Sequence, residues 1–357
     1  MRYCEVFVVI FIVSLWLLPS CLCQTNAVGS VYFHKLSTCP RQMPRDYQVS
    51  QVVASTSTGA LSCTVTCASS PVCNSIVFDP AAKTCHLSQQ VAAPDCLNME
   101  DIKDSRIYLE KRHSCKNGAT PRGDKCDCVP GYMGDNCELG PMRDCYDYMT
   151  IGKAQGTMVR MIRPTDNMTF PVNCLDALST VMIRRNNKIN FTRSWREYRD
   201  GFGNISDTHW LGLEKIRILT TQNRSYNLLV QVQLNNTASL YVLYNNFTVS
   251  DEKSFYQLHF ESVTLNSNHP GDCLSDLRGA NFSTYDSDND GDSSVNCASR
   301  HSGGWWFRGN ACSTCNPTGQ LLQPANGLRT GVDSEVFWIK DLGNIAPYRI
   351  SIRLQNP

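Results

Sequence analysis

Short runs of alternating hydrophobic and polar residues recur along most of the chain, a pattern typical of strands that bury one face. The clearest pair is Tyr226 to Gln233 and Ala238 to Tyr244, joined by Asn235-Asn236, which predicts a hairpin. Helical periodicity is rarer, and Phe191 to Phe202 is its main example in the C-terminal half. Many short strands with few helices predict an α+β fold.

A second group of elements is expected between residues 39 and 112. Ser55 to Cys73 is helix-like, and it places Cys63 and Cys67 four positions apart on one face. Three short strands follow in the pattern: Ser75–Phe78, Thr84–Leu87 and Arg106–Leu109. This part of the chain therefore reads as a small, cysteine-stapled α+β module.

Residues 1–23 have the organisation of a secretory signal peptide. Arg2 precedes an apolar run from Val6 to Leu18, a Pro19-Ser20 break follows, and cleavage is expected after Cys23. No later stretch approaches about 20 apolar residues, so the mature chain is expected to be exported and extracellular, with no membrane span.

Cysteine content agrees with an oxidising compartment. Three of the 19 cysteines lie in the predicted signal peptide, and the remaining 16 fall into groups from Cys39 to Cys96, Cys115 to Cys137, and Cys145 to Cys315. Zinc binding is the alternative, but Cys312-x-x-Cys315 has no matching second pair. Glycosylation is also expected at seven Asn-x-Ser/Thr sites: Asn167, Asn190, Asn204, Asn223, Asn235, Asn246 and Asn281.

The balanced net charge of +1 gives no indication of a nucleic-acid partner. Catalysis is not expected either, because the chain contains no His-Glu-x-x-His, no Gly-x-Ser-x-Gly and no glycine-rich phosphate loop. The function that remains is binding.

An acidic loop is the main candidate for chemistry. Asp286, Asp288, Asp290 and Asp292 stand at alternate positions around Gly291, and such closely spaced carboxylates repel one another unless a cation or water screens them. Calcium suits an irregular oxygen-rich loop better than magnesium does. Two alternatives stay open: an ordinary solvated turn, and an EF-hand, whose twelfth position would here be Cys297 instead of glutamate.

The 39–112 segment resembles a PAN/apple domain, a secreted binding module. The resemblance rests on Cys63-x3-Cys67-x5-Cys73, Phe78-Asp79 and Lys83-Thr84-Cys85-His86-Leu87. It implies three nested disulfides: Cys39–Cys96, Cys63–Cys85 and Cys67–Cys73.

Residues 113–138 look like the latter part of an EGF-like domain. The matching pieces are Cys115-Lys116-Asn117-Gly118, Cys126-x-Cys128 and Gly131 to Cys137, and the first and third family cysteines are missing. By position, Cys115 is expected to pair with Cys126 and Cys128 with Cys137. Arg122-Gly123-Asp124 could engage integrins from a tight loop, or it could be a chance tripeptide.

Residues 140–357 resemble a fibrinogen C-terminal domain nearly end to end. The matching motifs occur in the family's order: Asp144-Cys145, Phe170 to Cys174, Ile183-Arg184-Arg185, Trp195, Glu197-Tyr198, Gly201 to Asn204, His209 to Gly212, Phe282-Ser283-Thr284, Asn296-Cys297-Ala298 and Gly304-Trp305-Trp306. The family's glycine-rich turn after the second cysteine is absent, so that turn must be built differently.

This resemblance implies the disulfides Cys145–Cys174 and Cys297–Cys312. Cys273 and Cys315 have no usual counterpart in the family. They are expected to bridge each other, and a covalent oligomer through one or both is the alternative.

The resemblance also implies the site residues. Calcium would be held by the carboxylates of Asp288 and Asp290 and by backbone carbonyls near Asp292 and Ser294. In ficolin-like and tachylectin-like members an acetyl group binds beside this loop, and the matching positions are Arg300, His301, Phe307, Cys312 and Ser313. The family often has a cis peptide bond before the matching cysteine, here Ala311–Cys312. Ser313 replaces a frequent histidine, Trp305-Trp306 is expected in the core, and Arg300 and His301 could instead be ordinary surface residues.

The leading hypothesis is a secreted, calcium-assisted, lectin-like protein that binds glycans or acetylated groups on microbial or other cell surfaces, of the innate-immunity type. The alternative is an extracellular-matrix or receptor-binding adhesion protein, in the manner of tenascins and angiopoietins, in which the same fold contacts protein. Weak single sites gain avidity from multiple copies, so a homo-oligomer is a further expectation that the sequence leaves open.

Overall fold

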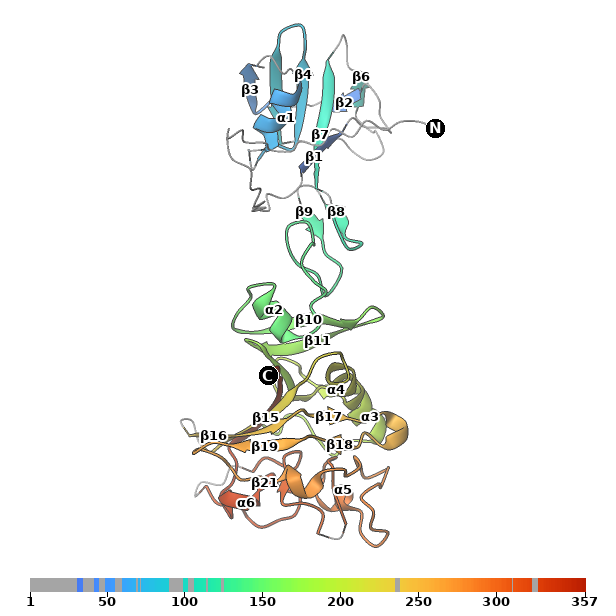
Figure 1. Cartoon of the computed structure of the whole chain (residues 1–357), viewed down its shortest axis with the longest axis vertical. Helices are drawn as coiled ribbons and strands as arrows, with labels where there is room; N and C mark the ends of the chain where they lie inside the picture. Colours follow the sequence, from blue (N-terminus) through green and yellow to red (C-terminus); the bar gives the residue numbers. More distant parts are fainter. Residues whose placement is uncertain are drawn as a thin grey trace, which may run out of the picture. The chain divides into compact units, whose positions relative to one another are not determined.

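The computed structural model describes residues 31–34, 42–44, 49–54, 60–68, 70, 72–89, 99–101, 106–113, 115–122, 125–234, 238–309, 311–322 and 327–357. The chain divides into two compact units, residues 1–138 and 139–357. Short strands, short helices and several disulfides make up both units, so the α+β, disulfide-rich fold class is confirmed (Figure 1).

The first unit contains a five-stranded antiparallel sheet in the order β1-β7-β4-β5-β3. Helix α1 packs against it, and Cys63, Cys67, Ile76 and Leu87 form the buried core between them. The cysteines four apart on α1 therefore face the sheet. The elements of this sheet and helix are β1 (Val31–His34), β3 (Gln51–Ala54), α1 (Ala60–Ala68), β4 (Ser75–Asp79), β5 (Thr84–Ser88) and β7 (Ile107–His113).

The first unit also contains two short antiparallel strand pairs. Strand β2 (Gln42–Pro44) pairs with β6 (Met99–Asp101), and β8 (Thr120–Arg122) pairs with β9 (Lys125–Asp127). Arg122 ends β8, and the glycine and aspartate that complete the Arg-Gly-Asp tripeptide lie outside the described residues. Its interpretation therefore stays a prediction.

The second unit is built on an antiparallel sheet in the order β10-β11-β12-β22-β15-β16-β19, to which β14 and β13 add beside β12. Strand β22, near the C-terminus, pairs with both β12 and β15 and is therefore a central strand of the sheet. The strands are β10 (Thr157–Thr165), β11 (Met168–Leu175), β12 (Leu178–Arg184), β13 (Phe202–Gly203), β14 (His209–Trp210), β15 (Asn227–Gln233), β16 (Ser239–Asn245), β19 (Ser262–Leu265) and β22 (Arg349–Gln355).

The turn that replaces the missing glycine-rich segment is a tight hairpin. Leu175 pairs with Leu178, so only Asp176 and Ala177 connect β11 to β12. Asp176 adopts a positive φ of 51°, and its carboxylate accepts a hydrogen bond from the backbone N–H of Gly156. A short aspartate-containing turn thus takes the place of the glycines.

Helix α3 is shorter than the periodicity predicted, covering Trp195–Asp200. It starts at a capping box in which Ser194 and Glu197 exchange hydrogen bonds, and it ends at Gly201, whose φ is 94°. Phe191 and Phe202, the ends of the predicted helix, are hydrophobic because they pack against each other (ring centroids 4.9 Å apart), not because they are helical.

Residues after Ser250 contain few regular elements. They carry the candidate site on loops that two disulfides hold together, Cys273–Cys315 and Cys297–Cys312. The short elements not yet named are α2 (Cys145–Thr150), α4 (Leu213–Thr220), β17 (Thr248–Val249), η1 (Glu252–Ser254), β18 (Leu258–His259), η2 (Leu274–Leu277), α5 (Cys297–Arg300), β20 (Cys315–Asn316), β21 (Phe337–Trp338) and α6 (Ile339–Leu342).

The described cysteines form the disulfides anticipated above, and Cys273 and Cys315 bridge each other within the chain. The expected Cys39–Cys96 pair lies outside the described residues. This number of bridges fits an extracellular protein. Of the helices in the described ranges, none is both long and apolar enough to cross a membrane. The bridges are Cys63–Cys85, Cys67–Cys73, Cys115–Cys126, Cys128–Cys137, Cys145–Cys174, Cys273–Cys315 and Cys297–Cys312.

Candidate functional site

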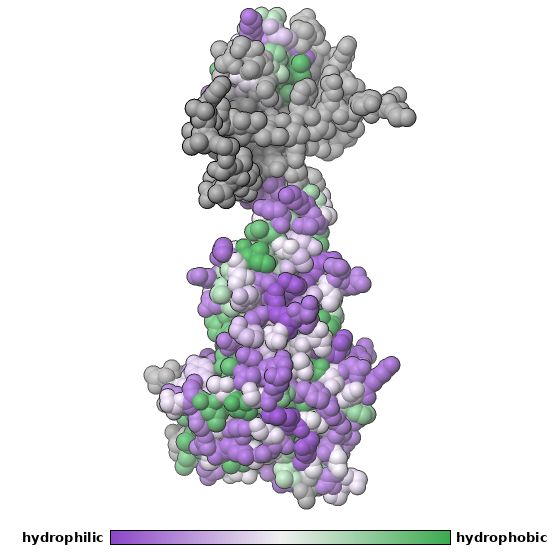
Figure 2. All heavy atoms as spheres, in the orientation of Figure 1, coloured by the Kyte–Doolittle hydropathy of each residue, from purple (hydrophilic) through white to green (hydrophobic). Residues whose placement is uncertain are grey.

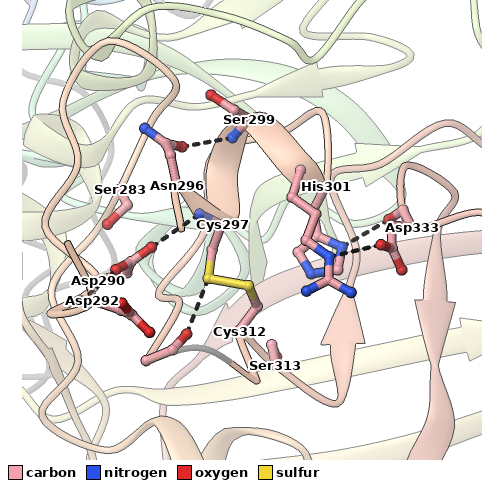
Figure 3. The surroundings of a disulfide bond; sticks show 12 residues. Ser283, Asp290, Asp292, Asn296, Cys297, Ser299, His301, Cys312, Ser313 and Asp333 are labelled. Atoms are coloured by element: carbon pink, nitrogen blue, oxygen red, sulfur yellow. Dashed lines mark hydrogen bonds and ion pairs between the residues drawn. A yellow bond between two sulfur atoms is a disulfide. The ribbon is translucent and has the colours of Figure 1, made fainter. Parts of the chain in front are cut away.

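The Cys297–Cys312 bridge lies between the two groups of candidate residues. The carboxylates of Asp290 and Asp292 are on one side of it, and His301 and Asp333 are on the other (Figure 3). The bridge connects the start of α5 to the segment that leads into β20. A change in the position of the acidic loop can therefore shift the predicted ligand segment, because the Cys297–Cys312 disulfide links the two.

Asp290 ties the acidic loop to this bridge. Its side chain is only 5% exposed, and its two carboxylate oxygens accept hydrogen bonds from the backbone N–H groups of Asp292 (2.8 Å) and Cys297 (3.0 Å). Its carbonyl accepts a third from the N–H of Gly309 (2.9 Å). Asp290 thus organises the loop whether or not an ion is bound.

Asp286 belongs to a different part of the structure. Its carboxylate accepts hydrogen bonds from the backbone N–H of Trp195 (2.8 Å) and the hydroxyl of Thr284 (2.7 Å). Trp195 is the first residue of α3, so Asp286 satisfies an N–H group that the helix leaves unpaired. The sequence offers no signal for this contact, because the partners are 91 positions apart.

Asp288 and Asp292 differ in how their carboxylates are used. Asp292 accepts hydrogen bonds from both the N–H (2.9 Å) and the hydroxyl (2.6 Å) of Ser294, which lower its pKa. Partial burial raises the pKa of Asp288, and the neighbouring charges of Asp290 and Asp292 act in the same direction. Asp288 is therefore the carboxylate that an added positive charge would relieve most.

These contacts test whether the residues fit a calcium ion. Asp288 and Asp290 are adjacent, since the N–H of Asp290 faces Oδ1 of Asp288 at 3.4 Å, and they supply the hard oxygen donors that calcium prefers. The side chains of Asp292 and Ser294 bond each other, which leaves their backbone carbonyls as donors. Over the described ranges, no group of three or more His, Cys, Asp or Glu side chains is placed to hold a metal. The fit is thus to a site of two carboxylates completed by carbonyls and water.

The ligand candidates on the other side of the bridge are mostly buried. Phe307 is fully buried, and the ring of His301, 5% exposed, stacks on it at 5.3 Å between centroids. His301 Nδ1 lies 2.7 Å from the carbonyl of Asp333, and the exposed Arg300 forms an ion pair with the Asp333 carboxylate at 2.7 Å. His301 and Phe307 therefore pack beneath the predicted ligand segment, while Arg300 remains at the surface.

Cys312 and Ser313 form the turn that leads out of the bridge. Cys312 has a φ of 58°, and its carbonyl accepts the N–H of Arg308, while the hydroxyl of Ser313 accepts the N–H of Cys315. The expected cis bond before Cys312 is wrong: among the described peptide bonds, Gly140–Pro141 is the cis one. A left-handed backbone at Cys312 turns the chain instead.

Trp305 and Trp306 are core residues. They are 0% and 2% exposed, and the indole N–H of Trp306 donates to the carbonyl of Tyr256 at 2.7 Å. Phe282, from the start of the acidic loop, packs edge-on against Trp306 with centroids 5.1 Å apart. The two tryptophans thus hold the start of the acidic loop against the core, and they offer no exposed surface to a ligand.

Burial of two histidines predicts a pH dependence. Burial lowers the pKa of both His209 and His301, so both stay neutral in the folded state at pH values where an unfolded histidine, with a pKa of about 6.5, already binds a proton. The unfolded state then binds more protons, and the free energy of unfolding should fall as the pH drops from 7 to 5.

Urea denaturation at pH 7, 6 and 5, followed by tryptophan fluorescence, measures this effect. Replacing His301 with asparagine should remove part of the slope. Equal stability at pH 5 and pH 7 would contradict the assignment.

Comparison with known proteins agrees with this architecture. Residues 141–352 match the family described as "Fibrinogen beta and gamma chains, C-terminal globular domain". Bovine (Bos taurus) fibroleukin is 34% identical over 209 residues, which cover 55% of this chain and 45% of fibroleukin. The chain thus spans about half the length of the first curated relatives it matches.

Two further relatives cover more of their own length. Fibrinogen-like protein A of Apostichopus parvimensis is 34% identical over 240 residues, which cover 63% of this chain and 81% of that protein. The fibrinogen-like globe domain of human ANGPTL2 superposes with a TM-score of 0.55 at 28% identity, covering 61% of this chain and all of that domain. The chain therefore belongs to the family of proteins with a fibrinogen C-terminal globular domain.

Proposed function

We propose that the chain is a secreted recognition protein that binds its ligand beside a calcium-stabilised loop in the 139–357 unit. The observation that carries the proposal is the position of Asp290, whose carboxylate joins the acidic loop to the N–H of Cys297. An ion shared by Asp288 and Asp290 would neutralise their mutual repulsion and rigidify the Cys297–Cys312 segment. A rigid segment loses less conformational entropy when a ligand binds.

The ligand proposed first is a glycan or an acetylated group. Arg300 and Ser313 are the predicted contact residues that keep solvent exposure, and the main chain around Cys312 could supply further hydrogen bonds. Phe307 and His301 are covered, so an acetyl group would have to bind through the main chain and these exposed side chains. The 39–112 and 113–138 modules, as PAN/apple-like and EGF-like units, are proposed as additional binding or spacing elements.

A protein ligand is the second candidate. The same burial of Phe307 and His301 favours it, because these two covered rings offer a small group no aromatic face, whereas a protein can contact a broader surface. Either ligand makes the chain a binding protein, and none of the named relatives suggests catalysis.

Substitutions in the acidic loop provide a matched test of the calcium site. Asp288→Asn should weaken calcium binding at least tenfold, measured by calorimetric titration of the calcium-free protein, because a carboxylate ligand loses its charge. Asp292→Asn removes the same charge from a side chain that bonds Ser294, so it should change the affinity by less than threefold. Equal effects of the two substitutions, or no calcium binding at all, would refute the site.

An array of glycans and acetylated ligands, probed with and without calcium, then tests the ligand. Calcium-dependent glycan binding that Asp288→Asn weakens supports the first candidate. Saturable binding to a cell-surface protein, with no glycan binding, supports the second. Weak binding by a monomer that strengthens on cross-linking would show that avidity from several copies is required.

A further inference from the structure

A cluster of arginines lies on one face of the large sheet, where Arg185 is exposed and Arg349 and Arg353 are half-buried. Inward residues of β22 such as Ile350 and Ile352 are buried in the core, so the alternate residues Arg349 and Arg353 point to the opposite face. The side chain of Arg184 points inward and bonds the carbonyl of Gly319, which turns the next residue, Arg185, outward. We call Arg185, Arg349 and Arg353 the arginine face.

Positive charge on this face is poorly compensated. Arg185 pairs with Asp207 at 3.3 Å, but in the described part of the chain neither Arg349 nor Arg353 forms an ion pair. Burial lowers the pKa of Arg353 to about 10, and the charges of Arg185 and Arg349 act in the same direction. Burial also lowers the pKa of Arg349, and the charge of Arg185 adds to the effect, while the charge of Asp207 acts in the opposite direction. Arg184 of β12 pairs with Ile350 of β22, so Arg185 lies beside Arg349, close enough for their charges to repel each other.

Two donors on this face have no partner. The Nε atoms of both Arg349 and Arg353 are buried and make no hydrogen bond to any described residue. A buried donor without a partner destabilises the fold, and a charged donor does so more than a neutral one. Guanidinium groups bind the oxygens of sulfate, phosphate and carboxylate in a planar, bidentate geometry. An oxyanion cannot reach the buried Nε atoms, but at the outer nitrogens of these guanidinium groups it would compensate the charge that the protein leaves unpaired.

Uncharged polar groups fill the space between the two arginines. Gln231 accepts hydrogen bonds from Ser351 (3.1 Å) and Arg353 (2.9 Å), and its amide donates to Ser239 and Tyr241 (both 3.1 Å). Arg349 and Arg353 are four residues apart on β22, which places their Cα atoms about 13 to 14 Å apart. The face thus offers cationic groups at intervals along an extended surface, with hydroxyl and amide groups between them.

We propose that the arginine face binds an acidic polysaccharide, with sulfate or carboxylate groups at Arg349 and Arg353 and sugar hydroxyls at the polar residues between them. A linear polymer with repeating negative charges matches cations spaced along a strand and requires no cavity. This surface is separate from the Asp288–Asp290 loop, and its ligand needs no calcium.

Affinity measurements on the full chain test the proposal. Heparin, hyaluronan, neutral dextran and a polyglutamate peptide serve as probes, each in calcium and in EDTA at low and physiological salt. Heparin should bind equally with and without calcium, and more weakly as salt rises. Arg349→Gln/Arg353→Gln should weaken heparin binding at least tenfold. The control Arg196→Gln/Lys253→Gln removes two exposed charges elsewhere and should change it by less than twofold.

Thermal denaturation of each variant verifies that it is folded, and inorganic sulfate should raise the melting temperature of the wild type more than that of the Arg349→Gln/Arg353→Gln variant. Heparin binding that this variant retains would overturn the proposal, as would the absence of binding to both acidic polysaccharides. Binding of polyglutamate alone would overturn it in favour of an acidic protein ligand. None of these outcomes depends on the calcium site.

Discussion

Replacing Gly201 with alanine is expected to destabilise the 139–357 unit by about 3 to 5 kcal/mol. Gly201 ends helix α3 with a φ of 94°, a conformation that disfavours any Cβ. A Cβ built there would also lie 2.3 Å from the carbonyl oxygen of Leu211, which is backbone and cannot rotate away. The backbone strain and the steric clash with Leu211 therefore both lower the free energy of unfolding of the alanine variant.

Gly156 provides a matched control for this substitution. Its φ of 87° is nearly the same, but a Cβ there would meet nothing within 4 Å. Gly156→Ala should therefore show only the conformational cost, about 1 to 2 kcal/mol. Five of the six tryptophans lie in residues 139–357 and the sixth, Trp16, lies in the predicted signal peptide, so fluorescence-detected urea denaturation reports this unit. Equal losses for the two substitutions would contradict the steric argument.

Asp144→Ala is expected to cause the second largest loss in the free energy of unfolding, about 3 to 5 kcal/mol. The Asp144 carboxylate is 1% exposed; it accepts the backbone N–H of Asp147 at the start of α2, the guanidinium of Arg224 at 2.9 Å and the hydroxyl of Tyr226. Removing it leaves two donors without an acceptor in a buried place and leaves Arg224 with Asp147, at 3.0 Å, as its remaining acidic partner. Asp144→Ala/Arg224→Met should cost less than the sum of the two single substitutions, giving a coupling energy above about 1 kcal/mol.

An exposed ion pair at a similar distance is the control for Asp144. Asp276 and Lys340 lie 2.8 Å apart, but their side chains are 58% and 40% exposed. Asp276→Ala should cost less than about 1 kcal/mol, because water replaces a surface partner. The difference between the two substitutions measures what burial contributes. A loss at Asp144 no larger than that at Asp276 would show that the buried network is not required.

Local sequence patterns determined most of the elements and the cysteine groups. The alternation in Tyr226 to Gln233 and Ala238 to Tyr244 predicted β15 and β16 to within a residue or so at either end, because strand periodicity is a property of neighbouring residues. Helical periodicity predicted α3, but four residues too early at its start and two too late at its end, because a capping box at Ser194 and the geometry at Gly201 set its ends. The order of motifs along the chain was enough to indicate the fibrinogen C-terminal family.

Tertiary structure decided which of the predicted site residues can bind an ion or a ligand and which are already engaged in contacts within the protein. Four aspartates in one run look equivalent in the sequence, yet the folded chain uses Asp286 to cap α3, Asp290 to hold Cys297 and Asp292 to bond Ser294, and leaves Asp288 with least compensation. Phe307 looks like a ligand contact in the sequence, yet the folded chain buries it completely.

The arginine face is the clearest case of a feature that only the fold creates. Arg185 follows β12, whereas Arg349 and Arg353 belong to the last strand, and they meet because β22 inserts beside β12 in the middle of the sheet. By itself, the sequence determined what depends on near neighbours: strand and helix periods, turn residues, cysteine spacing and the order of family motifs. Burial, hydrogen-bond partners and the pairing of charges depend on strand order, which brings residues together regardless of their separation along the chain.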